Sequence, residues 1–327
     1  MRAADRGESA QAEPAWIAIP LPVAGTHDGY RIDRFIHARI PRLSRTRIQH
    51  IIARGQVSTG AGPVTRVAQR VRAGEVVTVL RPAPPEPPVV LDYAVRHQDP
   101  DLLVIDKPAG LPVHPSARYH QHTLTAVMRG RLGAGHGWEM AHRLDRETSG
   151  VMVFGRRGAS ASVLKRSFQR REIDKQYLAL VHGHLTAPAT IEIPLGSDPG
   201  SAIRVKMGAR SPSAGGLPAR TEVAPLGHGR FRDEPITLVQ AVPRTGRQHQ
   251  IRIHLGERGT PLVGETVYDR DYDGPRLQAF DGGRGRPMLH AVTLGFLHPT
   301  RDLPLRFESD LSSDFADLLE RLEADSG

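Results

Sequence analysis

The chain has 327 residues and no cysteine, and its length is enough for about two domains of ordinary size. The lack of cysteine excludes a disulfide framework, a catalytic thiol and thiolate-bound zinc or iron–sulfur sites. Lysine and arginine number 44 against 35 acidic residues, which gives a net charge of +9. Such an excess is typical of proteins that bind polyanions, and nucleic acid is the first candidate partner.

We expect no targeting signal and no membrane-spanning segment from the sequence. Residues 1–15 contain three acids and no apolar stretch, and no apolar run approaches the roughly 18 to 20 residues needed to cross a bilayer. We therefore expect a cytoplasmic protein with no signal peptide and no membrane partner. Residues 1–29 are rich in Ala, Pro, Gly and charge, which predicts a poorly ordered tail.

The positive charge is concentrated in residues 31–72, which hold ten arginines, no lysine and one acid. Within this segment, Ser44 and Gly55 flank a stripe of isoleucines, a pattern that predicts a capped helix between them. Short strands are expected at 56–58 and 76–80. We therefore predict a small α+β domain over residues 30–82.

One face of the predicted helix is basic, because Arg47, His50 and Arg54 recur at helical spacing and Arg45 lies in the first turn. A solvated helix face would show the same pattern. The exclusive use of arginine, which binds phosphate in a bidentate manner and stacks on bases, favours RNA. We therefore expect these four side chains to contact RNA.

The segment from Arg31 to Leu80 resembles the alpha-L RNA-binding domain, which occurs in a ribosomal small-subunit protein and is attached to several RNA-modifying enzymes. One turn departs from the family pattern, because this chain has Ser58-Thr59-Gly60 where the family usually has Asn-Gly. The resemblance implies that residues 30–82 bind RNA.

A second domain is predicted after a proline-rich linker at 83–88, where the high proline content favours a stiff, extended chain. Residues 89–327 show short apolar or alternating segments with few long helices between them and a closing amphipathic helix at 310–322. This pattern predicts an α+β domain with a mixed, largely antiparallel sheet. The expected strands are 102–105, 150–154, 177–182, 237–242 and 291–296.

The motifs of phosphate-binding loops, dinucleotide-binding folds, zinc peptidases and serine hydrolases are missing from the sequence. Among the sixteen histidines, the closely spaced pairs His182/His184 and His249/His254 lack a carboxylate partner at the spacing that metal ligands need. We therefore expect neither a metal nor a cofactor.

Two polar clusters follow or precede predicted strands. In the first, Ala141 to Gly150, Asp145 lies between Arg143 and Arg146, and these cations favour its ionised form, which suits a nucleophile or base. An aspartate that merely closes a turn would give the same pattern. The second cluster, residues 243–254, contains Arg247, which could reach a carboxylate on a neighbouring strand.

Together with Asp106-Lys-Pro-Ala-Gly, Lys175-Gln-Tyr and residues 289–299, these clusters resemble, in order, the RluA-type family of pseudouridine synthases. The likeness covers about residues 89–307 and implies the pseudouridine synthase fold. The family's usual Val-Gly-Asp reads Val263-Gly-Glu265 here. The implied roles are a catalytic carboxylate for Asp145, displacement of the target base for Arg143, stacking on the uracil for Tyr177 and a basic partner of the aspartate for Arg247.

The resemblance implies that the protein isomerises specific uridines in RNA to pseudouridine, by breaking N1–C1′ and joining C5 to C1′ of a flipped-out nucleotide. The aspartate could add to C6, attack C1′ or take the 2′ proton, and all three routes remain open. The attached domain favours large-subunit ribosomal RNA over transfer RNA. The alternatives are a non-catalytic RNA-binding ribosome-assembly factor and a glycoside hydrolase, which would need a second carboxylate beside Asp145.

Overall fold

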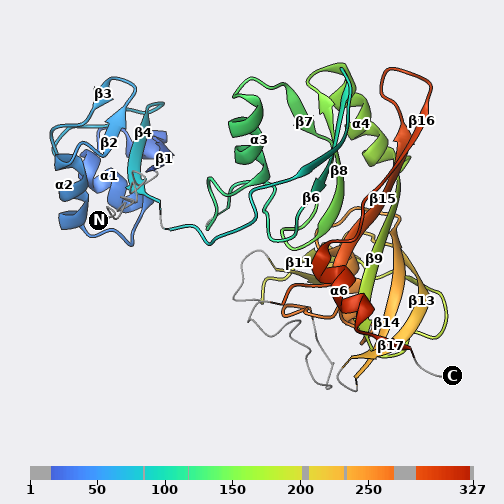
Figure 1. The fold of residues 1–327 in the computed structure, drawn as a ribbon. Coiled ribbons are helices and arrows are strands. Elements are labelled where there is room, and N and C mark those ends of the chain that lie inside the picture. The colour runs from blue at the N-terminus through green and yellow to red at the C-terminus, as the bar shows by residue number, and fades with distance from the viewer. Residues whose placement is uncertain are drawn as a thin grey trace, which may run out of the picture. The chain divides into compact units, whose positions relative to one another are not determined.

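The computed structural model describes residues 16–83, 85–116, 118–200, 206–231, 234–268 and 285–324. The chain forms two compact units, residues 1–86 and 87–327 (Figure 1). The division lies inside the proline-rich segment for which a linker is predicted. None of the helices in the described ranges has the length and hydrophobicity needed to span a bilayer.

The first unit is a four-stranded antiparallel sheet with two short helices and one 3-10 turn. Its strands follow the spatial order β1-β4-β2-β3. The apolar sides of the sheet and of both helices share one core, which includes Phe35, Ile48 and Val77. The elements are β1 (Trp16–Pro22), η1 (Gly25–His27), α1 (Ile32–Arg39), α2 (Arg45–Ala53), β2 (Val57–Thr59), β3 (Gly62–Pro63) and β4 (Val76–Pro82).

Helix α2 confirms the predicted capped helix. The Ser44 hydroxyl accepts a hydrogen bond from the Arg47 N–H at 3.3 Å, which satisfies one of the free donors at the helix start. Ile48 and Ile52 are buried on the opposite face. Gly55, which ends the segment, has a φ of 70°, a left-handed conformation that glycine adopts without strain.

The predicted tail over residues 1–29 is wrong for its second part. Strand β1 pairs with β4 from Trp16 opposite Pro82 to Pro22 opposite Val76, and Leu21 is buried. Composition misled the prediction because the partner strand is distant in sequence, and local Ala and Pro content does not reveal such pairing. Residues 1–15 lie outside the described residues.

The second unit is built on one large mixed sheet, which confirms the predicted α+β class. Its main path runs β10-β13-β14-β9-β15-β8-β6-β5. Every pairing among the described strands is antiparallel except that of β15 with β8. The strands are β5 (Ala94–Gln98), β6 (Leu102–Lys107), β7 (Trp138–Met140), β8 (Ser149–Arg156), β9 (Asp174–His182), β10 (Ala189–Ile191), β13 (Thr221–Phe231), β14 (Glu234–Pro243), β15 (Leu289–Leu297), β16 (Pro304–Glu308) and β17 (Glu323–Ala324), with β11 (Leu195–Ser197) and β12 (Met207–Ala209) forming a separate pair.

Helices cover both faces of this sheet (Figure 1). Helix α3 (Leu124–Leu132) contributes Met128 to a core with Met152, whereas α4 (Ala159–Arg170) contributes Leu164 to a core with Val153. Since side chains alternate along a strand, Met152 and Val153 point to opposite faces of β8. The two helices therefore lie on opposite sides of this half of the sheet.

The other half of the sheet is covered in the same way. Helix α5 (Gln250–Glu257) packs its Leu255 with Ala179, and α6 (Ser313–Glu320) packs Phe315 with Leu180. Helix α6 confirms the predicted closing amphipathic helix, although it begins three residues later. A 3-10 turn, η2 (Pro212–Ala214), completes the described helices.

The parallel contact between β8 and β15 depends on a glycine. Gly150 has a φ of 118°, and a Cβ atom there would lie 2.2 Å from the carbonyl oxygen of Ala291. The two backbones can therefore approach only when residue 150 has no side chain. This contact fixes the start of β8, directly after the loop that carries Asp145.

We expect Gly150→Ala to lower the free energy of unfolding by about 3 kcal/mol, because it adds both backbone strain and a clash with another strand. Urea denaturation followed by circular dichroism measures this loss. Gly227→Ala is the matched control: the position is in β13 with open space around it, and its effect should stay within about 0.5 kcal/mol. Equal stabilities of the two variants would contradict the role of Gly150.

Candidate active site

A cavity of about 700 Å³ lies in the second unit, between the loop that precedes β8 and the segment that joins β14 to α5. This volume is within the range of roughly 300–1,000 Å³ that is usual for small-molecule sites. Four residues implied by the family resemblance line it: Arg143, Asp145, Tyr177 and Arg247. The structure therefore brings the two sequence clusters together around one cavity.

Asp145 lies in the irregular loop between β7 and β8, and its side chain is 17% exposed. Its carbonyl accepts a hydrogen bond from the Thr148 N–H at 3.2 Å, so the backbone closes a turn as the alternative interpretation expected. The carboxylate takes no part in that turn and lines the cavity. Turn formation and a chemical role are therefore compatible at this residue.

Two buried cations hold the backbone just after Asp145. Lys107 Nζ donates to the Arg146 carbonyl at 3.0 Å, and Arg286 Nη1 donates to the Glu147 carbonyl at 3.0 Å. The Arg286 guanidinium is a charged donor, which makes a stronger hydrogen bond than a neutral one, and the two contacts together restrain the loop on its interior side. The position of the carboxylate follows from the position of this backbone.

Lys107 explains why the Asp-Lys-Pro segment belongs to the site. The side chain is 1% exposed, and its Nζ also donates to the carbonyls of Pro108 at 2.7 Å and Leu111 at 3.0 Å. Burial lowers the pKa of Lys107 to about 7, and the nearby charge of Glu147 opposes this shift. Lys107 thus joins two loops of distant sequence through one buried amino group.

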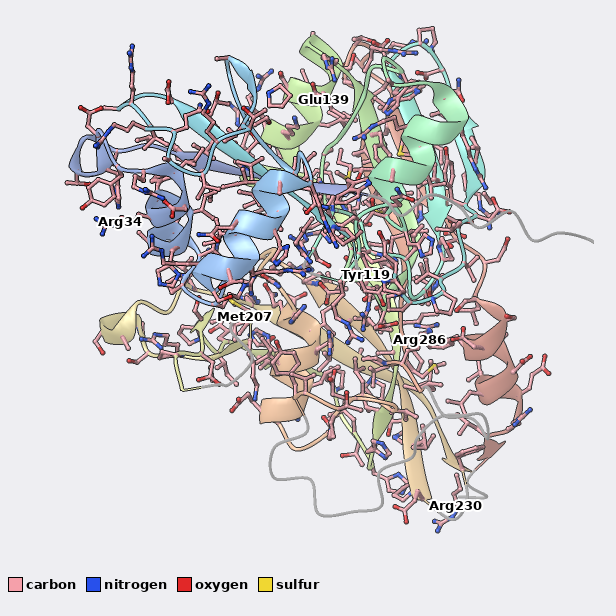
Figure 2. All side chains as sticks on the ribbon, turned by 90° about the vertical axis from the view of Figure 1, so that its left-hand side faces the viewer. Arg34, Tyr119, Glu139, Met207, Arg230 and Arg286 are labelled. Atoms are coloured by element: carbon pink, nitrogen blue, oxygen red, sulfur yellow. The ribbon has the colours of Figure 1, made fainter. Side chains whose placement is uncertain are left out.

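Arg286 joins the same loop to helix α6, and Figure 2 shows the residue beside this helix. Its Nη2 donates to Asp314 Oδ1 at 2.9 Å and to Ser312 Oγ at 2.8 Å. The arginine side chain is only 7% exposed, so its charge is balanced by Asp314 within the protein. The helix at the end of the chain therefore contributes to the position of Asp145.

The cation next to the Asp145 carboxylate is Arg252, in α5. Its Nη1 lies 3.9 Å from Asp145 Oδ2, while Nε and Nη2 make a bidentate pair with Glu265 at 2.8 and 2.7 Å. The side chains of Arg252 and Glu265 are 9% and 0% exposed. One guanidinium therefore serves two carboxylates, of which only Asp145 lines the cavity.

The electrostatics of this pair are set by competition between burial and charge. Burial alone would lower the pKa of Arg252 and raise that of Glu265. The hydrogen-bonded ion pair outweighs burial in both residues, so the pKa of Arg252 is raised and that of Glu265 is lowered. Both groups are charged at neutral pH, and Arg252 presents a permanent positive charge to Asp145.

The prediction that Arg247 pairs with Asp145 is wrong. Arg247 lines the cavity, but its Nε donates to the Pro218 carbonyl at 3.1 Å. The chain turns after β14, with Gln250 accepting the Arg247 N–H at 3.0 Å, and α5 begins there. The helical period, rather than an extended strand, decides which arginine faces Asp145, and it selects Arg252.

His249 is a second neighbour of Asp145 that the sequence prediction missed. Its Nε2 lies 3.8 Å from Asp145 Oδ1, and its Nδ1 lies 2.6 Å from the Tyr268 hydroxyl. The Tyr268 oxygen also accepts the Met207 N–H at 3.4 Å, which leaves its proton for Nδ1. Burial lowers the pKa of His249, so the ring is neutral, and we assign its proton to Nε2, facing Asp145.

Tyr177 lies on β9 and contributes its ring to the wall of the cavity. Burial raises the pKa of Tyr177, and the charge of Asp145 raises it further. The side chain is therefore a neutral phenol at physiological pH. Arg143, by contrast, is exposed and makes no hydrogen bond with the described residues, so its guanidinium is available to a ligand.

A possible group of metal ligands lies outside this cavity. Asp99, Asp101 and His298 bring three ligand atoms within 4.8 Å of one another. Asp99 Oδ2 is 3.0 Å from His298 Nε2, and Asp101 Oδ2 accepts the Thr300 hydroxyl at 2.7 Å. These contacts connect the β5–β6 turn to the end of β15, which gives the group a structural role.

In the first unit, the four predicted RNA-contacting residues, three in α2 and Arg54 at its C-cap, are all exposed. Arg45 Nη2 donates at 3.1 Å to Asp33, a fully buried carboxylate that also pairs with Arg31. Arg47, His50 and Arg54 point to solvent, as Arg34 of α1 does in Figure 2. Their contact with RNA remains a prediction.

We expect Glu265→Gln to destabilise the protein by about 3–5 kcal/mol, because it leaves the buried Arg252 without its main counter-charge, and to slow any reaction at Asp145. Chemical denaturation and product formation measure the two effects. Glu222→Gln is a control, since Glu222 pairs with two exposed arginines at the surface and its loss should change stability little. Similar stabilities of the two variants would contradict the importance of the buried pair.

Comparison with known proteins supplies the family. The sequence model of the family described as RNA pseudouridylate synthase matches residues 101–257. The ribosomal large subunit pseudouridine synthase D of Xanthomonas campestris pv. campestris is 34% identical, over 91% of this chain and 90% of that protein. The synthase of the same name from Yersinia pestis is 30% identical, over 95% and 96%.

Solved structures agree with this similarity. The human RNA pseudouridylate synthase domain containing 4 is 29% identical and has a TM-score of 0.53, covering 70% of this chain and 94% of that chain. The human RNA pseudouridylate synthase domain containing 1 is 25% identical and has a TM-score of 0.54, covering 74% and 100%.

Proposed function

The chain belongs to the RNA pseudouridylate synthase family, and we propose that it isomerises particular uridines of large-subunit ribosomal RNA to pseudouridine. The observation that carries this proposal is the position of Asp145, a carboxylate in a nucleotide-sized cavity between Arg252 and Tyr177. The names of the Xanthomonas and Yersinia relatives favour ribosomal RNA over transfer RNA as substrate. An enzyme that acts on this RNA must meet it, so we also propose a cytoplasmic location.

The reaction moves one bond and one proton. The N1–C1′ bond breaks, C5 bonds to C1′, the C5 proton leaves and N1 gains a proton, so no redox change is involved. Addition to C6, attack at C1′ and removal of the 2′ proton all begin with an ionised Asp145. Arg252 places a positive charge 3.9 Å from one carboxylate oxygen, and His249 presents a neutral Nε2–H to the other oxygen.

The remaining cavity residues suit a base that has left the RNA stack. Taking a nucleotide out of a stack costs a few kcal/mol, which stacking on a side chain recovers in part. The neutral ring of Tyr177 offers such a surface inside the cavity, and the exposed guanidinium of Arg143 is available to fill the place of the displaced base. We propose these roles for the two residues.

The charge pattern of the cavity does not favour glycoside hydrolysis. That chemistry needs two cooperating carboxylates, and Asp145 is the single acid among the described residues that line the cavity. Glu147, the nearest acid in sequence, pairs with the Arg146 Nε at 2.6 Å. It is therefore not presented to a substrate at Asp145.

We propose further that the first unit is an alpha-L RNA-binding domain, extended at its start by β1, with residues 83–88 as a linker to the catalytic domain at 89–327. The exposed basic face of α2 supports this role, because Arg47 and Arg54 have no partner among the described residues. A basic face of this kind contacts phosphates without reading sequence. It would add affinity, and the choice of uridine would come from elsewhere.

Asp145→Asn should reduce pseudouridine formation by at least about 10³-fold, because the amide cannot act as nucleophile or base, while RNA affinity stays nearly unchanged. Carbodiimide mapping of an unmodified large-subunit rRNA transcript measures product, and filter binding measures affinity. Asp302→Asn, an exposed aspartate in the same unit, serves as the control. An active Asp145→Asn enzyme would refute the proposed mechanism.

Replacing Arg47 and Arg54 together by Gln should weaken RNA binding and reduce the slope of log affinity against log salt by roughly 1.4 to 1.8, since each lost phosphate contact removes about 0.7 to 0.9. Affinities measured at several salt concentrations test this. A double variant at Arg301 and Arg306 removes the same charge from the second unit. If both double variants gave the same slope, α2 would have no special role.

A further inference from the structure

The catalytic cavity contains more positive charge than its chemistry uses. Among the described residues, seven lysines and arginines line it against one carboxylate, Asp145. A cation that has no counter-charge inside the protein is available to an anionic ligand. The question is which of these cations has no partner inside the protein.

Four of the seven are already engaged. Lys165 Nζ donates to Glu139 at 2.8 Å, and Arg244 Nη2 donates to Glu222 at 2.7 Å. Arg252 pairs with Glu265, and Arg247 donates to a carbonyl, as described above. Arg143 is the residue proposed above to fill the place of the displaced base. Two cations, Arg171 and Lys175, remain without a hydrogen bond or an ion pair to any described residue.

Lys175 and Arg171 lie close together beside the uracil-stacking surface. Lys175 precedes Tyr177 by two residues in β9, so both side chains leave the same face of the strand, about 6.6 Å apart along it. Burial lowers the pKa of Lys175, and the neighbouring Arg171 guanidinium lowers it further. The positive charge of Arg171 therefore disfavours the protonated form of Lys175, and a bound anion would offset this effect.

The backbone at Arg171 supports a role for its side chain. Arg171 ends α4 in the left-handed conformation, with a φ of 64°, where glycine is the usual residue. A side chain at such a position is strained relative to glycine. Here that side chain is placed in the cavity wall, next to Lys175.

We propose that Lys175 and Arg171 form a subsite for one phosphodiester of the RNA backbone, the one that adjoins the uridine whose base stacks on Tyr177. This inference rests on the proposed function. A flipped nucleotide brings its own phosphate with it, and the spacing from Tyr177 to Lys175 is one that a single nucleotide spans. The phosphate would restore charge balance to the two cations and fix the sugar relative to Asp145.

The test uses the full-length protein and an unmodified large-subunit rRNA transcript. Lys175→Gln should raise KM about tenfold with kcat little changed, and should reduce the slope of log affinity against log salt by about 0.7. Arg171→Gln should act in the same direction. Arg301→Gln is the control, because it removes one exposed positive charge of the second unit outside the cavity, and it should leave KM and the slope unchanged.

A second set of variants distinguishes the loss of the Lys175 charge from a structural effect of the substitution. Lys175→Arg keeps the charge and should restore KM and the salt slope, which a purely structural role of the lysine would not predict. A transcript with a neutral methylphosphonate on one side of the target uridine should have a KM about tenfold higher with wild-type protein. With Lys175→Gln, the same methylphosphonate should raise KM no further. The proposal would be overturned if Lys175→Gln and the methylphosphonate lowered activity independently, so that their effects multiply, whichever side of the uridine carries the methylphosphonate.

The two levels of inference fail in different ways. If wild-type protein makes no pseudouridine in the transcript, the proposed function falls and the subsite falls with it. If wild-type protein is active but Lys175→Gln retains the wild-type KM and salt slope, the subsite alone is refuted.

Discussion

The buried guanidinium of Arg252 is the contact on which the site depends. A charge buried this deeply is costly without a partner, and the bidentate pair with Glu265 provides the compensation. The pair leaves Nη1 directed at Asp145 and connects α5, the segment around residue 265 and the loop before β8. Because both charges are enclosed, Arg252 cannot move away from the carboxylate without breaking a buried ion pair. The electrostatic environment of Asp145 is thus built into the core.

Two other buried cations give the same loop its shape. Lys107 and Arg286 donate to the carbonyls of the two residues that follow Asp145, and Gly150 lets β8 approach β15 immediately afterwards. Preorganisation of this kind lowers the barrier of a reaction, because no rearrangement is needed when substrate arrives. In the proposed mechanism, the polar motifs of the sequence therefore divide into one residue that reacts, Asp145, and several that hold its backbone.

The success of sequence interpretation depended on how local each feature is. Helix α2 was predictable because its cap, its apolar face and its terminal glycine are adjacent in the chain. The family's motifs pointed to Asp145 and Tyr177, which line one cavity in the structure, and their roles in the reaction remain a proposal. Strand β1 and the choice of Arg252 over Arg247 depend on pairing with distant strands and on where α5 begins, which local patterns do not encode. Local patterns also do not predict the hydrogen bond from Tyr268 to His249, since the fold must bring the two rings together.

The most direct test of a uridine isomerase with Asp145 as its reacting group is pseudouridine mapping in total RNA from cells that lack the gene. We predict that particular large-subunit ribosomal sites lose the modification, and that wild-type protein restores them while an equally abundant Asp145→Asn protein does not. A map that is the same with and without the gene, or one that the Asp145→Asn protein restores, would contradict this function and the role of the carboxylate.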